Sequence, residues 1–146
     1  MRAETKMDFS PVSYQQTAGL VYYYDTYSHF YACVTRDEKK GRVLTMMVEE
    51  LYKFTMPLGV GVVLPENGSV WLRLDVDGLA AQFSYSINGE DYKPFGPVLN
   101  AGVMSDEYYH NCGQQRFTGA FVGICCQDLS GHLAPADFDY FSYQEK

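Results

Sequence analysis

Apolar and charged side chains alternate from the second residue onward, which is the period of a β-strand with one buried face. Between residues 2 and 9 every second position is charged, and the positions between them are Ala3, Thr5, Met7 and Phe9. This segment therefore predicts a half-buried strand. Natural domains usually have some lead-in before a core strand, so we expect that the start of the chain is truncated.

Two runs rich in aromatic and β-branched residues follow at 19–25 and 29–35. Such residues suit the pleated, half-buried surface of a sheet. Thr26-Tyr27-Ser28 separates the two runs. Two strands with so short a break between them predict a β-hairpin.

Residues 42–49 and 51–56 follow a charged turn that ends in Gly41, and they predict two more short strands. The run 46–51 taken alone is also compatible with a helix. It is short, however, and turn residues flank it. Strand is therefore the preferred interpretation of this run.

The segment 70–87 predicts a regular hairpin. Its arms, 70–77 and 79–87, both alternate, and Asp77-Gly78 between them is a two-residue turn of the kind that tight hairpins favour. Asn88-Gly89 supplies another such turn. The predicted apolar face carries Val70, Leu72, Leu74, Val76, Leu79, Ala81, Phe83, Tyr85 and Ile87.

Residues 117–131 and 135–143 predict the closing pair of strands, whereas 100–116 show no sustained period. A loop of that length is uncommon unless it has a function or carries short structure of its own, so we expect this region to contact a partner. Roughly ten short strands separated by turns predict an all-β fold, a two-sheet antiparallel β-sandwich that forms a single domain over residues 1–146.

Composition supports a β fold and excludes several classes of partner. The 13 Tyr and 9 Phe favour strands, and a net charge of −7, from 11 Lys and Arg against 18 Asp and Glu, excludes a nucleic-acid partner. There is no run of about 18 apolar residues, so no membrane span is expected. Residues 1–15 contain no apolar leader segment, which predicts a cytoplasmic location.

Four cysteines stand at positions 33, 112, 125 and 126, without a Cys-x-x-Cys pair. Cys125 and Cys126 are neighbours on a predicted strand, so their side chains point to opposite faces and cannot easily form a disulfide with each other. Free thiols in a reducing compartment are the preferred interpretation.

Asp137 and Asp139 are candidate catalytic residues. They lie two residues apart on a predicted strand, so their carboxylates point from the same face and are about 6 to 7 Å apart. Such a separation could serve an inverting glycosidase. A solvated outward face explains the pair better, as it does Asp75 and Asp77. There is also no Glu-x-Asp-x-x-Glu pattern, so we expect no catalytic residues in this chain.

Metal binding has little support in the sequence. His29, His110 and His132 are far apart, and only His110 and Cys112 place two candidate ligands close together. A zinc site needs a full set of ligands with compatible spacing. No nucleophile elbow or glycine-rich phosphate loop is present, so we expect neither a metal nor another cofactor.

Several aromatic residues could stack on sugar rings, because the apolar face of a pyranose packs well on an aromatic ring. Burial in the core, or in a domain or subunit interface, is the alternative for each. An independent carbohydrate-binding module or lectin is therefore an alternative function. The candidates for sugar or interface contacts are Trp71, Tyr108 and Tyr109, with Tyr22 and Tyr24 beside them.

Four segments together resemble a known family over nearly the whole chain and in the right order: 15–24, 41–44, 83–92, and the closing run 117–143. The closing run, Phe-Thr-Gly-Ala-Phe-Val-Gly followed by Cys-Gln-Asp-Leu-Ser-Gly and Ala-Asp-Phe-Asp-Tyr-Phe, is the most specific of them. The chain resembles the C-terminal, non-catalytic domain of β-xylosidases of glycoside hydrolase family 43. The resemblance implies a concanavalin A-like jelly roll.

The resemblance also implies a parent enzyme of the β-xylosidase or α-L-arabinofuranosidase type, whose N-terminal five-bladed propeller carries the catalytic carboxylates. That propeller, and the first strand or strands of the sandwich itself, would precede Met1. The parent would cleave terminal xylose from xylo-oligosaccharides and form homo-oligomers, while this chain alone would be inactive. The family pattern places Phe117 at the propeller's sugar pocket, where it would help to close the site. A core position at a strand start is the alternative for Phe117.

Overall fold

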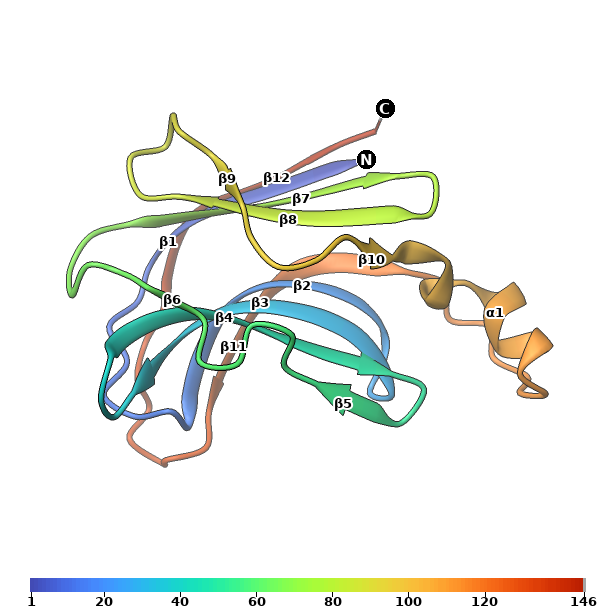
Figure 1. Ribbon diagram of the computed structural model, residues 1–146, viewed down its shortest axis with the longest axis horizontal. Helices are drawn as coiled ribbons and strands as arrows, with labels where there is room; N and C mark the ends of the chain where they lie inside the picture. Colours follow the sequence, from blue (N-terminus) through green and yellow to red (C-terminus); the bar gives the residue numbers. More distant parts are fainter. Residues whose placement is uncertain (146) are drawn as a thin grey trace.

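Two antiparallel sheets packed face to face make up most of the computed structural model, which describes residues 1–145 (Figure 1). The predicted all-β, two-sheet sandwich of the jelly-roll type is confirmed. The first sheet contains β1 (Arg2–Asp8), β7 (Val70–Asp77), β8 (Ala80–Ser86), β9 (Lys93–Pro94), β10 (Leu99–Asn100) and β12 (Asp137–Gln144). The second contains β2 (Gln16–Asp25), β3 (Ser28–Asp37), β4 (Gly41–Glu50), β5 (Lys53–Thr55), β6 (Val62–Val63) and β11 (Phe121–Asp128).

The order of strands places the two ends of the chain in the first sheet. That order is β10-β8-β7-β1-β12, with β9 added to β8, and the second sheet runs β11-β2-β3-β4-β5, with β6 added to β4. The closing strands β11 and β12 therefore do not pair with each other. Each forms the edge of a different sheet, and the loop between them crosses from one layer to the other (Figure 1).

Alternation along the strands decides what is buried. The predicted inner face of the first strand is buried, with Ala3, Thr5 and Met7 all at 0% exposure. The same holds for the central positions of the β7–β8 hairpin, where Leu72 and Phe83 are fully buried. A fully buried Leu, Met or Phe of this kind stabilises the fold by about 1.5–3 kcal/mol, because its apolar surface is removed from water.

The outer face of the first sheet is charged, as predicted. Its carboxylates and cations pair across neighbouring strands, so charges of the same sign are not left opposite one another on this solvent-facing side. These ion pairs are Arg2 with Asp75 (2.9 Å), Arg73 with Glu4 (2.7 Å) and Lys6 with Asp139 (2.5 Å).

One charged side chain lies inside. Arg42 on β4 is only 2% exposed, and its guanidinium donates hydrogen bonds to the carbonyl oxygens of Phe9 (3.0 Å) and Pro65 (3.1 Å). Burial lowers the pKa of this guanidinium, because a charged group loses its hydration there. Arg42 thus joins β4 to the end of the first strand and to the loop after β6.

The structure differs from the predicted elements in several places. The closing strand predicted from residue 117 begins only at Phe121, as β11. Residues 51–56 form only the short strand β5, because Leu51 and Tyr52 adopt positive φ angles of 47° and 69° in the turn that precedes it. The aperiodic segment 100–116 carries a 3₁₀ helix, η1 (Ala101–Met104), and a helix, α1 (Asp106–Asn111). The run 46–50 is strand, as predicted.

Within residues 1–145, no helix has the length and apolar character needed to cross a membrane. Across the same part of the chain, no three His, Cys, Asp or Glu side chains gather in a position to hold a metal ion.

Leu72→Ala should lower the free energy of unfolding by about 3 kcal/mol, within a range of roughly 2–5, because it leaves a cavity between the two sheets. Leu79→Ala is the matched control, since Leu79 lies in the neighbouring turn and is 71% exposed; it should change stability by less than about 0.5 kcal/mol. Urea denaturation of both variants measures the difference. Equal losses would contradict the assignment of the core face.

Candidate functional site

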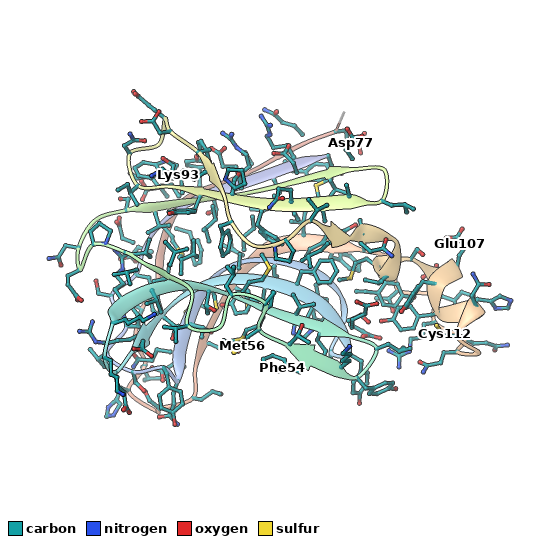
Figure 2. All side chains as sticks on the ribbon, viewed as in Figure 1. Phe54, Met56, Asp77, Lys93, Glu107 and Cys112 are labelled. Carbon is teal, nitrogen blue, oxygen red and sulfur yellow. The ribbon has the colours of Figure 1, made fainter. Side chains whose placement is uncertain are left out.

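One end of the sandwich projects beyond the sheets. It consists of η1, α1 and the loop 112–120 that leads into β11, and it is the orange segment at the right of Figure 1. Figure 2 labels Glu107 and Cys112 on this projection. Phe117 lies in the loop with 84% of its surface exposed, before β11 begins at Phe121. Phe117 is therefore not a core residue at a strand start, and that alternative is wrong.

The residue before Phe117 is fixed to the sandwich. The Arg116 guanidinium forms an ion pair with Asp25 and donates a hydrogen bond to the Tyr52 hydroxyl (2.8 Å). It also lies 4.8 Å from the ring centroid of Tyr109 and 5.2 Å from that of Tyr27, within cation–π range. These contacts tie the loop to the β2–β3 and β4–β5 turns of the second sheet.

The residues after Phe117 are fixed as well. The Thr118 amide approaches the Tyr24 hydroxyl oxygen at 3.4 Å, and the Gly119 amide approaches Asp106 Oδ1 at the same distance. The Tyr24 hydroxyl in turn donates to Asp106 Oδ1 at 2.6 Å. Phe117 is thus an exposed aromatic side chain on a loop whose backbone is attached on both sides.

Helix α1 rests on the core through aromatic stacking. The Tyr24 and Tyr109 rings stack with centroids 4.4 Å apart and an interplanar angle of 15°. Burial, and the hydrogen bond to the Asp106 carboxylate, raise the pKa of Tyr24. Ser105 caps the helix, because its hydroxyl accepts a hydrogen bond from the Tyr108 amide (3.2 Å). Tyr24, the last inner-face residue of β2, therefore connects the core of the sandwich to the helix.

A shallow pocket of about 270 Å³ lies between α1 and the loop. Its volume is slightly below the roughly 300–1,000 Å³ of typical ligand sites. The side chains that line it are Asp106, Glu107, His110, Asn111, Gln114, Gln115, Arg116 and Phe117.

Aromatic side chains also gather on the outer face of the second sheet at this end. One cross-strand row runs over β11, β2, β3, β4 and β5, and the directly paired residues share a face. Its residues are Phe121, Tyr23, His29, Glu49 and Phe54. Phe121 is 59% exposed and Phe54 is 55% exposed. Tyr27 and Tyr52, with ring centroids 4.4 Å apart, cover the adjoining hairpin turns. We call the exposed set Tyr23, Tyr27, Tyr52, Phe54, Phe117 and Phe121 the aromatic end.

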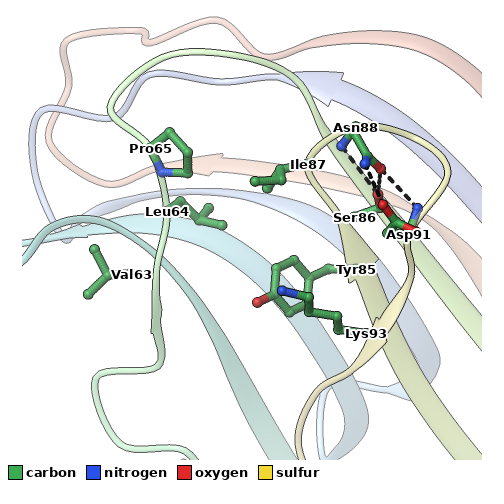
Figure 3. A pocket seen from close by; sticks show the side chains of 9 residues that line it. All are labelled: Val63, Leu64, Pro65, Tyr85, Ser86, Ile87, Asn88, Asp91 and Lys93. Atoms are coloured by element: carbon green, nitrogen blue, oxygen red, sulfur yellow. Dashed lines mark hydrogen bonds between the residues drawn. The ribbon is translucent and has the colours of Figure 1, made fainter.

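A larger pocket of about 560 Å³ lies elsewhere, between the loop after β6 and the β8–β9 connection (Figure 3). Ile87, Leu64 and Tyr85 supply much of its apolar wall. The Asn88 side chain forms hydrogen bonds within its own turn. It accepts from the Glu90 and Asp91 amides and donates to Asp91 Oδ2 (2.8 Å). None of the predicted site residues lines this pocket.

The structure separates the other predicted contact residues. Tyr109 has 0% exposure, so the prediction that it contacts a sugar or partner directly is wrong: its ring packs inside the fold. Tyr22 and Tyr24 are buried too, in line with the core alternative. Trp71 is half-buried on the outer face of the first sheet, with Lys6 Nζ 5.4 Å from its ring centroid.

Tyr108 is half-buried, and its hydroxyl donates a hydrogen bond to Glu50 Oε1 (3.1 Å). Tyr108 therefore lies at the edge of the projecting end, and its ring does not present a fully exposed face.

The acidic and histidine candidates do not form a site. Asp137 and Asp139 are both exposed on the edge strand β12, and Asp139 pairs with Lys6, which agrees with a solvated outward face. Asp75 is the partner of Arg2 on the same face of the sheet. The three histidines lie on separate elements: His29 on β3, His110 in α1 and His132 in the loop before β12.

Sequence reasoning missed the anchoring residues. Arg116 is a single cation in an aperiodic segment, and its partner Asp25 is 91 positions away. Tyr24 and Asp106 are 82 positions apart. The absence of a period in 100–116, the aromatic candidates and the family resemblance pointed to this region, but none of them identified these pairs, because pairs so distant leave no local pattern.

Comparison with known proteins identifies a family that the chain matches and several similar proteins. Residues 1–144 match the family described as the beta-xylosidase C-terminal concanavalin A-like domain. The beta-xylosidase of Bacillus subtilis is 42% identical over 145 residues, which is 99% of this chain and 27% of that protein. The xylosidase/arabinosidase 43B of Humicola insolens is 42% identical over 146 residues, again 27% of its length. The chain thus spans about a quarter of the curated relatives it matches.

The fold also matches solved structures. The crystal structure of xylan beta-1,4-xylosidase from Bacillus halodurans C-125 superposes with a TM-score of 0.93 and 39% identity, covering 99% of this chain and 27% of that one.

Arg116→Met should loosen the loop that carries Phe117. Loss of the charge-assisted contacts to Asp25 and Tyr52 should raise amide hydrogen exchange at residues 117–119 roughly tenfold or more. Arg36→Met is the control, because the Arg36–Glu66 pair is a more exposed surface ion pair whose loss should have little effect. Unchanged exchange in the Arg116 variant would show that the loop is not held by this residue.

Proposed function

The chain belongs to the family of C-terminal concanavalin A-like domains of beta-xylosidases, and from that premise we propose that it is the accessory domain of a glycoside hydrolase that removes terminal xylose from xylo-oligosaccharides. The family resemblance implies that the catalytic carboxylates of such an enzyme lie in an N-terminal propeller, and the match to a C-terminal domain supports placing that propeller before this domain. The domain packs on that propeller and performs no proton transfer itself. An enzyme of the α-L-arabinofuranosidase type fits the same arrangement, as one relative's name combines both activities.

The observation that carries the proposal is the presentation of Phe117. Its ring is 84% exposed, while Arg116 and Thr118 on either side contact the sandwich. An isolated exposed phenylalanine gains nothing for the fold. Held in place, it can cover the apolar face of a xylose ring and exclude water from a pocket whose other walls come from the propeller.

The rest of the aromatic end supports docking against the propeller. Interfaces are enriched in Tyr, Phe and Arg. The aromatic side chains among them bury much area at a small loss of conformational freedom. Tyr52, Phe54 and Phe121 are each more than half exposed at this end. Arg116 lies behind them, paired with Asp25, so docking would not bury an unpaired charge.

The proposal extends to location and assembly. Free thiols at Cys33, Cys112, Cys125 and Cys126 support a cytoplasmic enzyme, since a reducing compartment keeps cysteines unpaired. Homo-oligomerisation of the whole enzyme is part of the same proposal, and its support is the family resemblance alone.

A carbohydrate-binding module is the second candidate, favoured by the volume of the pocket in Figure 3, which lies within the range of ligand sites. Calorimetric titration of the isolated chain with xylo-oligosaccharides distinguishes the two. Saturable binding that Tyr85→Ala weakens would favour the module, and a flat titration to millimolar sugar would remove it.

A chimera tests the proposed function. This chain replaces the 145 residues that it matches in the Bacillus subtilis beta-xylosidase, and the product is assayed with a chromogenic xyloside. Phe117→Ala in the chimera should lower kcat/KM roughly tenfold to a hundredfold, because one apolar wall of the pocket is lost. The pH profile should stay the same, because Phe117 carries no proton.

Tyr14→Ala is the matched control. Tyr14 is another exposed aromatic (66%), but it precedes β2 and so lies at the other end of the second sheet. It should leave kcat/KM unchanged. Full activity of the Phe117 variant would contradict the pocket role. Xyloside hydrolysis by the isolated 146-residue chain above buffer background would contradict the accessory role.

A further inference from the structure

The pocket in Figure 3 lies where the inner face of the first sheet extends past the second sheet. The inner-face series of β8 reaches Tyr85 and continues to Ile87, just beyond the strand. The opposite wall consists of Val63, from the two-residue strand β6, and of Leu64 and Pro65 after it. Ile87 is 54% exposed and Val63 is 57% exposed, so apolar side chains of both layers face a solvent-filled space of about 560 Å³.

Both walls of this pocket are fixed by hydrogen bonds. On one side, the Leu64 amide donates to the Arg42 carbonyl oxygen (2.9 Å), and the Arg42 guanidinium donates to the Pro65 carbonyl oxygen (3.1 Å). On the other side, the Ser86 hydroxyl oxygen is buried and accepts from the Gly89 amide (3.0 Å). The pocket is therefore formed before any ligand binds, which lowers the entropic cost of binding.

A lysine belongs to the inner face at this pocket. Lys93 of β9 pairs directly with Tyr85, and Tyr85 pairs directly with the fully buried Leu72. Residues directly opposite each other in an antiparallel pair share a face. Lys93 is also two positions before the buried Phe95, so both assignments agree. Its side chain lines the mouth of the pocket, where it is exposed.

The Lys93 ammonium is uncommitted. Among residues 1–145 it has neither a hydrogen bond nor an ion pair, whereas the lysine of β1, Lys6, is paired with Asp139. The Tyr85 hydroxyl also has no hydrogen-bond partner within the described part of the chain. The pocket thus offers one cation and one hydroxyl to a ligand.

The other polar side chains of the pocket are already used. Ser86 and Asn88 form hydrogen bonds within their own turn, and Asp91 Oδ2 accepts from the Asn88 amide group. A neutral sugar carries several hydroxyl groups, and each one that is buried without a partner costs free energy. The composition of the pocket therefore favours a ligand with an apolar face and a single charged group.

The charge of that group follows from its surroundings. A carboxylate accepts charge-assisted hydrogen bonds from an ammonium, and these are roughly twice as strong as neutral ones. A phosphate monoester carries about −1.5 to −2 charges at neutral pH. It would meet only one cation, beside the Asp91 carboxylate and in a chain of net charge −7. A monocarboxylate matches the single lysine.

We propose that this pocket binds a small monocarboxylate whose carboxyl group is attached to a ring with an apolar face. The carboxylate accepts from Lys93, and the ring packs against Tyr85 and Ile87. Two kinds of molecule share this chemistry: an acid with an apolar ring, and a sugar acid. The proposal goes beyond the accessory role of the domain and does not depend on it.

Titration of the isolated chain with sodium benzoate, sodium glucuronate and xylose, followed by NMR amide shifts, tests the proposal. At least one of the two acids should bind saturably, with the largest shifts at residues 63–65 and 85–93, and the tighter of the two identifies the kind of ring. Xylose should bind at least tenfold more weakly, because it cannot pair with the lysine. Binding of neither acid, or binding of xylose as tight as that of the acids, would overturn the proposal.

Lys93→Met removes the charge and keeps the length of the side chain, so it should weaken binding of the acid roughly tenfold or more. Lys53→Met is the matched control: Lys53 is an exposed lysine on β5 that does not line the pocket, and its replacement should leave the affinity unchanged. Equal affinities of the Lys93 variant and the unmodified chain would contradict recognition of the carboxylate by this residue.

Ile87→Ala tests the apolar wall. Ile87 is more than half exposed, so the variant should fold, and loss of part of the ring contact should weaken binding roughly threefold to tenfold. Unchanged affinity would place the ligand elsewhere.

An inward lysine can also serve to prevent strand pairing at a sheet edge. If no acid binds and sedimentation shows that Lys93→Met causes self-association, Lys93 has that role alone and the proposal is wrong. None of these measurements uses xyloside hydrolysis. An inactive chimera would count against the proposed function and leave the ligand titrations intact.

Discussion

Burial of every second side chain between two facing sheets is the constraint on which the rest of this structure depends. β1, which lies between two other strands of the first sheet, shows it plainly: it is hydrogen-bonded to β7 on one side and β12 on the other, and its inner residues have no exposed surface. The charges between them are forced outward, where they pair with neighbours such as Asp75 and Asp139. A register slip of one residue would exchange the two faces, so the alternation fixes the pairing as well as the core.

The site at the projecting end is an extension of that constraint. The inner-face series of β2 ends at Tyr24, whose ring stacks on Tyr109 and whose hydroxyl binds Asp106. Helix α1 is short, and a helix of 6 residues has little stability of its own. It is held because its buried tyrosine completes the aromatic core. The loop with Phe117 is then attached to that helix and, through Arg116, to the turns of the second sheet.

The sequence predicts the sheets better than it predicts the site, and the reason is the distance over which each kind of information acts. Alternation in 2–9 and 70–87 is local, and both segments form strands with the expected inner faces. Leu79 and Ile87 are the exceptions, because they lie just outside β8 and are 71% and 54% exposed. The pairing of Arg116 with Asp25 is set by tertiary packing, so no local period reveals it. Tyr109 shows the same limit: in an aperiodic segment nothing separates a buried aromatic from an exposed one.

Exposed apolar side chains fall into two physically different groups in this molecule. Phe117 is exposed on a loop whose neighbours are anchored, so its exposure is a property of the built structure and persists however the sheets are completed. Ile124 and Phe141 differ from it, since their strand register assigns them to the inner faces of the sheets although they are 45% and 41% exposed. Exposure alone does not distinguish a contact surface from an unfinished core. The strand register does, because it states which face a residue belongs to independently of what happens to cover it.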